Sequence, residues 1–105
     1  MRRGEVYRFR IPKGIGHEQQ EERYGIIVQA DELLPRSVVL VAPTSRSARP
    51  ASFRPEVEVA GDVTRVLVEQ VGAVDAQRLV KRVGHLTAVE MWTVDDALAT
   101  VLGLT

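Results

Sequence analysis

A permanent cation and two hydroxyls border two short apolar runs of this 105-residue chain. Arg23 stands just before the first run, and Thr44 and Ser45 close the second. A guanidinium binds phosphate through two parallel hydrogen bonds, and hydroxyls add neutral donors. Groups at strand ends also hold their geometry better than groups on free loops. These residue types, with Glu18 nearby, indicate an anion site.

The segment after Thr44 is basic. It contains Arg46, Arg49 and Arg54 before the next acidic residue, although the formal net charge of the chain is zero. The first 54 residues hold ten Lys or Arg against six Asp or Glu, and the rest hold four against eight. A basic patch is typical of proteins that bind a polyanion. The alternative is a solvated loop whose arginines keep an edge strand soluble, and composition does not separate the two.

Strands must position these residues, because most segments are short, rich in β-branched residues and bounded by turn formers. The two central runs are apolar throughout, as in strands covered on both faces, and Pro43 argues against a helix there. Ala60-Gly61-Asp62 marks a hairpin turn, and a kink is expected at Gly72. The expected strands are residues 4–11, 24–30, 37–42, 53–59, 63–74 and 80–86.

One helix is expected, and it begins at Thr87. Thr87 and Glu90 have the spacing of a capping box, and Gly103 stands where a C-terminal cap belongs. A helical turn capped by Asp75 and a long polar loop at 12–22 complete the chain. The apolar face of the helix comprises Met91, Val94, Leu98 and Val101. The absence of a βαβ rhythm predicts a β-rich α+β fold in one domain, 1–105: a small, bent antiparallel sheet or barrel with a C-terminal helix.

Composition narrows the function classes. The chain has no cysteine, which excludes disulfides, thiol catalysis and thiolate metal sites, and fits a cytoplasmic protein. No apolar run approaches the ~18 residues that span a membrane, and no charged-then-apolar leader opens the chain. We therefore expect no membrane partner.

Other chemistries fit the residues less well. His17 and His85 could form an acid–base pair, but nothing in the sequence brings them together. His17, Glu18 and Asp31 have no metal-ligand spacing, so no metal site and no cofactor is expected. Trp92 could stack on a nucleobase, although on a helix it more often packs or anchors an interface.

The sequence resembles a known family along nearly its whole length. Glu18-Gln19 and Arg23, followed by an Ile-Ile-Val strand, resemble the opening motif of the MazF/PemK (Kid) toxins. These are endoribonucleases of type II toxin–antitoxin pairs. The further similar segments are Arg3-Gly4-Glu5-Val6-Tyr7, Val41-Ala42-Pro43-Thr44-Ser45, Val68-Glu69-Gln70-Val71, Val83-Gly84-His85-Leu86 and Val101-Leu102-Gly103-Leu104.

The resemblance implies an SH3-like barrel with a C-terminal helix, working as a cytoplasmic homodimer. It implies ribosome-independent, metal-independent cleavage of single-stranded RNA at short sequences, and a cognate antitoxin as partner. Arg23 and Thr44 are then the catalytic residues, with Glu18 as the better general base because the pKa of free Arg exceeds ~12. The residues expected to contact RNA are Gln19, Ser45, Arg46, Arg49 and Gln70.

The sequence departs from the family pattern in two places, and two other interpretations of its function remain. The family usually has Pro where this chain has Tyr24, and Gly-Ser-Glu where it has Gly16-His17-Glu18. One rival is a toxin like the CcdB gyrase poisons, which use an aromatic residue near the C-terminus. This chain ends Gly103-Leu104-Thr105, which counts against that reading. The other rival is a non-catalytic SH3-like binding module.

Overall fold

The computed structural model describes residues 1–10 and 22–105. The predicted polar loop lies outside the described residues except for Glu22, which begins a strand. Within the described chain the strands are β1 (Glu5–Arg10), β2 (Glu22–Ile27), β3 (Val38–Ser45), β4 (Glu56–Val59), β5 (Asp62–Val66), β6 (Gly72–Asp75) and β7 (Leu79–His85). Three 3₁₀ turns, η1 (Asp31–Leu33), η2 (Val68–Gln70) and η3 (Ala76–Arg78), and one helix, α1 (Ala88–Val101), complete them.

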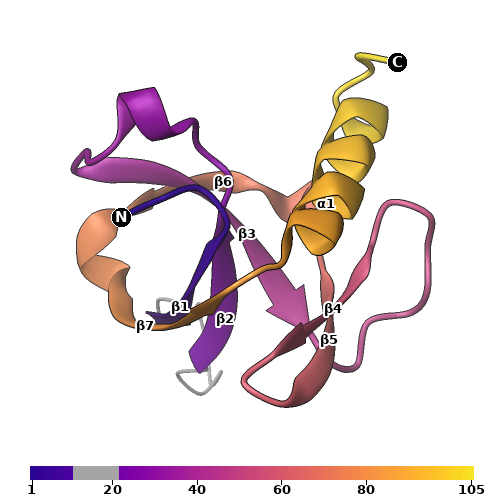
Figure 1. The fold of residues 1–105 in the computed structure, drawn as a ribbon, viewed down its shortest axis with the longest axis horizontal. Helices are drawn as coiled ribbons and strands as arrows, with labels where there is room; N and C mark the ends of the chain where they lie inside the picture. Colours follow the sequence, from indigo (N-terminus) through magenta and orange to yellow (C-terminus); the bar gives the residue numbers. More distant parts are fainter. Residues whose placement is uncertain (11–21) are drawn as a thin grey trace, which may run out of the picture.

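The strands form one antiparallel sheet in the order β4-β5-β3-β2-β1-β7, and β6 also pairs with β3. The sheet curls strongly, and β4 and β7, at the two ends of this order, come into contact. Figure 1 shows the resulting half-barrel with α1 packed on its open side. The predicted fold class, a bent antiparallel sheet with a C-terminal helix, is confirmed.

The strand predicted at 63–74 is wrong in one respect, because η2 divides it into β5 and β6. β5 pairs with the end of β3 at Thr44 and Ser45, whereas β6 pairs with its beginning, from Val38 to Val41. The chain must therefore step along the same edge of β3 between the two pairings. The step begins where the Leu67 N–H donates to the Pro43 carbonyl (2.8 Å), and η2 completes it.

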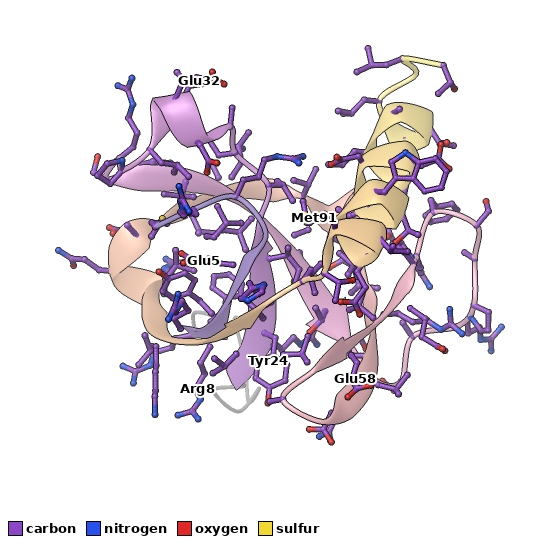
Figure 2. The ribbon with its side chains drawn as sticks, viewed as in Figure 1. Glu5, Arg8, Tyr24, Glu32, Glu58 and Met91 are labelled. Atoms are coloured by element: carbon purple, nitrogen blue, oxygen red, sulfur yellow. The ribbon has the colours of Figure 1, made fainter. Side chains whose placement is uncertain are left out.

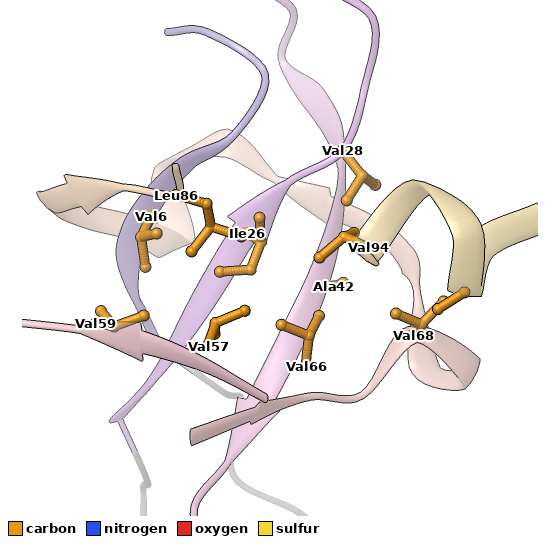
Figure 3. Close-up of a cluster of buried hydrophobic side chains, with 11 residues drawn as sticks. Val6, Ile26, Val28, Ala42, Val57, Val59, Val66, Val68, Leu86 and Val94 are labelled. Atoms are coloured by element: carbon orange, nitrogen blue, oxygen red, sulfur yellow. The ribbon is translucent and has the colours of Figure 1, made fainter. Parts of the chain in front are cut away.

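The central strands bury side chains on both faces, as predicted, except at the start of β3, where Val38 and Leu40 are exposed. We call the face toward α1 the inner face; its buried cluster includes Ile26, Ala42, Val66 and Val94, drawn in Figure 3. The opposite face carries a second cluster of Phe9, Ile27, Val39, Val41 and Leu79. Neighbouring residues such as Ile26 and Ile27 belong to different clusters because side chains alternate along a strand.

Helix α1 begins with the predicted capping box. The Thr87 hydroxyl accepts from the Glu90 N–H (3.1 Å), and the Glu90 carboxylate accepts from the Thr87 N–H (2.9 Å). The second carboxylate oxygen of Glu90 accepts from the Glu58 N–H on β4 (2.9 Å), so the same side chain fastens the helix to the sheet.

The rest of the helix follows the expected apolar face, with Val94 and Ala97 buried against the inner face. Gly103, with φ of 71°, ends it, and the Leu104 N–H donates to the Ala99 carbonyl. Trp92 is 73% exposed, so it lies outside the core of the described residues. No helix among the described residues is long and apolar enough to cross a membrane.

Replacing Glu90 tests the joint between α1 and β4. Burial raises the pKa of Glu90, but hydrogen bonds from the Glu58 and Thr87 N–H groups outweigh it, leaving the pKa below 4.5. A lowered folded-state pKa means that the carboxylate stabilises the fold above pH 4.5 and ceases to do so as the pH falls through its folded value. We expect Glu90→Ala to lower the free energy of unfolding by about 1–2 kcal/mol at pH 7.

The measurement is urea unfolding of wild type and Glu90→Ala at pH 7 and at pH 3, with Glu58→Gln as the control. Glu58→Gln also removes a carboxylate at this joint but keeps the backbone N–H that Glu90 binds. The gap between wild type and Glu90→Ala should narrow at pH 3. An equal gap at both pH values would contradict the role of the charged carboxylate.

Candidate functional site

The inner face changes from apolar to polar toward one end of its strands. On β2, Tyr24 lies two residues before Ile26; on β3, Thr44 lies two residues after Ala42. Ile26 and Ala42 pair directly, and Thr44 pairs with Val66 of β5. Since residues two apart share a face, the row of core side chains continues into Tyr24 and Thr44.

A cavity of about 540 Å³ opens at this polar end. Strand β2 contributes Arg23 and Tyr24 to its lining, and the end of β3 contributes Thr44 and Ser45. Tyr24 packs partly against the inner cluster and lies between β2 and the β4–β5 hairpin (Figure 2). Arg23 and Thr44, 21 positions apart in the sequence, are thus brought to one cavity.

Thr44 is fixed by its surroundings. Only 3% of the residue is exposed, and its hydroxyl donates to the carbonyl oxygen of Tyr24 (3.2 Å). A hydroxyl has one proton to donate and keeps lone pairs that can accept. To donate to a phosphate oxygen, Thr44 must therefore turn its proton away from Tyr24.

Strand β5 supplies the opposite wall with Asp62 and Thr64. Asp62 lies 3.9 Å from the guanidinium of Arg46, and the two side chains are 49% and 73% exposed. The Thr64 hydroxyl is buried and has no hydrogen-bond partner in the part of the chain that the structure describes. A buried hydroxyl left unpaired costs about 1–3 kcal/mol.

Arg54 does not extend the basic surface expected after Thr44. Its guanidinium binds the carboxylate of Glu69, from Nε at 2.7 Å and from Nη2 at 2.5 Å, and a further nitrogen donates to the Arg49 carbonyl. Burial raises the pKa of Glu69, but the hydrogen bond from Arg54 and its charge help to lower it overall. Arg54 therefore ties the loop after β3 to η2.

The cavity gathers only some of the predicted site residues. Arg23, Thr44, Ser45 and Arg46 line it, whereas Arg49 and Gln70 are exposed residues outside its lining. Glu18 and Gln19 lie outside the described residues. The roles assigned to all eight stay predictions.

The sequence reading missed Tyr24, Ser47, Asp62 and Thr64 as cavity residues. Tyr24 stood out only as a departure from a family pattern, and Asp62 only as a turn former. Alternation along β5 places Asp62, Thr64 and Val66 on one face, which was a usable signal. It pointed to the site only once the pairing of β5 with β3 was known.

Comparison with known proteins shows which family this chain belongs to. Residues 2–102 match the profile of the PemK-like, MazF-like toxins of type II toxin–antitoxin systems. Rv3098A, a candidate toxin of Mycobacterium tuberculosis, is 42% identical over 104 residues, covering 97% of each chain. Endoribonuclease MazF9 of the same organism is 29% identical over 117 residues, covering 99% of this chain and 98% of MazF9.

The fold has a solved counterpart. An endoribonuclease from a mycobacterial species, in complex with its cognate antitoxin, superposes with a TM-score of 0.82 at 21% identity. The alignment covers 100% of this chain and 97% of that one. The chain therefore belongs to the PemK-like, MazF-like toxin family, as its sequence motifs indicated.

Proposed function

We propose that this chain is an endoribonuclease toxin that cuts single-stranded RNA without a ribosome or a metal ion. The observation that carries the proposal is the convergence of Arg23 and Thr44 on one cavity in a member of this family. Its relative MazF9 bears the name endoribonuclease, which supports the same activity here.

The chemistry suits these groups. The ribose 2′-oxygen attacks the adjacent phosphorus while a base takes the 2′-OH proton; the bond from phosphorus to the 5′-oxygen breaks, and the 5′-oxygen takes a proton from water. The products are a 2′,3′-cyclic phosphate and a 5′-OH. Arg23 neutralises the charge that develops on the phosphorane, and Thr44 donates to a non-bridging oxygen. A preorganised donor of this kind is typically worth ~10²–10³ in rate. Glu18 is our candidate for the base.

Substitution of Arg23 and Thr44 tests the assignment. Arg23→Ala should lower the cleavage rate of a long mixed-sequence RNA by about 10²–10³ or more, because the main cation at the phosphate is lost. Arg23→Lys keeps the charge but not the two-pronged geometry, so its rate should fall between the two. Thr44→Val keeps the buried shape, and it should lose activity while Thr44→Ser retains part of it.

Circular dichroism and thermal melting serve as controls for folding of each variant. Cleavage by the wild type should persist in excess EDTA, since Arg23 supplies the positive charge, and should leave cyclic-phosphate ends. Full activity in a folded Arg23→Ala protein would overturn the site. Activity lost in EDTA and restored by Mg²⁺ would indicate a metal-assisted mechanism instead. Arrest of gyrase without RNA cleavage would favour the gyrase-poison rival.

We also propose that the toxin works as a homodimer. Val38 and Leu40 of the central strand β3 are 52% and 44% exposed, and Ala73, which pairs with Leu40, is exposed as well. Half-exposed apolar side chains on a central strand form a surface that a second copy can cover. Light scattering at micromolar concentration should give twice the monomer mass. A Leu40→Glu variant should shift toward monomer, and a monomeric wild type would refute the proposal.

The partner we propose is an acidic antitoxin segment that orders over the cavity and the arginines beside it. Arg46 and Arg49 would meet either this segment or RNA, so the two should compete. Arg46→Glu/Arg49→Glu should weaken both and reduce the dependence of RNA affinity on salt. Arg78→Glu/Lys81→Glu is the matched control, because it makes the same charge change at exposed residues outside the cavity lining. A ternary complex with uncut RNA bound at full affinity would contradict competition.

A further inference from the structure

The β5 wall of the cavity carries Asp62 and Thr64, which have no role in the phosphate chemistry proposed above. Asp62 places a carboxylate 3.9 Å from Arg46 in the cavity that Arg23 also lines, where the proposed function puts a polyanion. Its ion pair with Arg46 is long and exposed, and such pairs contribute about 0–1 kcal/mol. Repulsion from the RNA backbone would therefore make Asp62 a net disadvantage, unless the carboxylate accepts hydrogen bonds from the substrate.

Two neighbours of Asp62 suit a nucleobase. Tyr24 supplies an aromatic ring that packing against the inner cluster holds in place. Thr64, two residues along β5 on the same face, supplies a buried hydroxyl that lacks a partner among the described residues. Proteins that read single-stranded RNA stack splayed bases on aromatic rings and bind their Watson–Crick edges.

The edge that fits a carboxylate is that of guanine. N1–H and the N2 amino group of guanine stand side by side, so the two oxygens of a carboxylate can accept two parallel bonds. In cytosine and adenine the amino group adjoins a ring nitrogen that is an acceptor, which repels the second oxygen. In uracil the single N3–H lies between two carbonyl oxygens, which repel both. The O6 of guanine is an acceptor beside N1–H, and it suits the Thr64 hydroxyl.

We propose that this cavity binds the guanine next to the scissile phosphate, with Tyr24 stacking on the base, Asp62 accepting from N1–H and N2–H, and Thr64 donating to O6. The inference rests on the proposed ribonuclease function and adds its base preference. Tyr24 and Asp62 are then specificity residues, distinct from the catalytic pair Arg23 and Thr44.

The first test maps cleavage sites in a long mixed RNA for wild type, Asp62→Asn and, as a matched control, Asp96→Asn. Asp96 is an exposed carboxylate on α1, outside the cavity lining. Wild type and Asp96→Asn should favour guanine at one position flanking the cut. Asp62→Asn should reduce that preference about tenfold or more, as expected for a bidentate contact worth ~1–3 kcal/mol. A wild type with no guanine preference overturns the proposal but leaves the ribonuclease function intact.

The second test replaces that guanine by inosine, which lacks only the N2 amino group. Inosine should slow wild type and Asp96→Asn about tenfold and have little effect on Asp62→Asn, because asparagine keeps one acceptor oxygen, for N1–H, and has no second one for the N2 amino group. Equal slowing in all three proteins overturns the role of Asp62. Thr64→Val keeps the shape of the side chain and should also reduce the preference for guanine; an unchanged preference overturns the contact with O6.

The third test separates stacking from base reading and needs no cleavage. Binding of guanosine 3′-monophosphate and inosine 3′-monophosphate is measured by chemical-shift titration of wild type, Tyr24→Phe and Tyr24→Leu. Tyr24→Phe should bind as wild type does. Tyr24→Leu should weaken both nucleotides about 5- to 150-fold, since base stacking on an aromatic ring is worth ~1–3 kcal/mol. Equal binding by Tyr24→Leu and wild type overturns stacking. Guanosine nucleotide bound without any RNA cleavage would leave the base site standing while the ribonuclease proposal fails.

Discussion

The eight residues of the central strand β3 contribute buried side chains to the clusters on both faces of the sheet, and their backbone pairs with other strands along both edges. The rest of the structure depends on this strand. Buried backbone N–H and C=O groups must be hydrogen-bonded, so a strand inside a sheet needs partners along both edges. β2 covers one edge, and β5 and β6 share the other. The site forms where β2, β3 and β5 run side by side, at the end of β3 that carries Thr44.

Close contact between β2 and β3 adds a second constraint beside the site. A Cβ on Gly25 would lie 2.6 Å from a methyl carbon of Val41, closer than real Cβ contacts come. Gly25 therefore leaves room for the buried Val41 side chain next to Arg23 and Tyr24. Any other residue at position 25 would force Val41 or the backbone of β2 to shift, and the positions of these two side chains would change with it.

Local patterns in the sequence were enough to predict much of the fold. The apolar runs of β2 and β3, the hairpin turn before Asp62 and the capping box of Thr87 and Glu90 each depend on residues close in the chain. The break at η2 was not predictable in this way, because it depends on how the edge of β3 is shared. The pairing of Arg54 with Glu69 joins residues 15 apart, and nothing in the loop itself distinguished Arg54 from Arg46.

Dependence on residues far apart in the chain also explains why only part of the site was predicted. Arg23 and Thr44 were named because they flank conspicuous runs and match a family motif. Tyr24, Asp62 and Thr64 become a group only when three strands are set in register, since alternation assigns each residue to a face but not to a neighbour.

Charge pairing within the chain decides how RNA could be held. Carboxylates bind Arg3, Arg54, Arg65 and Arg82 at 3.3 Å or less, whereas Arg46 meets Asp62 only at 3.9 Å. The formal net charge is zero, so no long-range field of the whole molecule favours a polyanion. On the proposed function, phosphate contacts would hold the RNA, but phosphate contacts alone carry no sequence information. The proposals above give the cavity both tasks: Arg23 and Arg46 would hold the phosphate, and Tyr24 of β2 with Asp62 and Thr64 of β5 would select the base beside it.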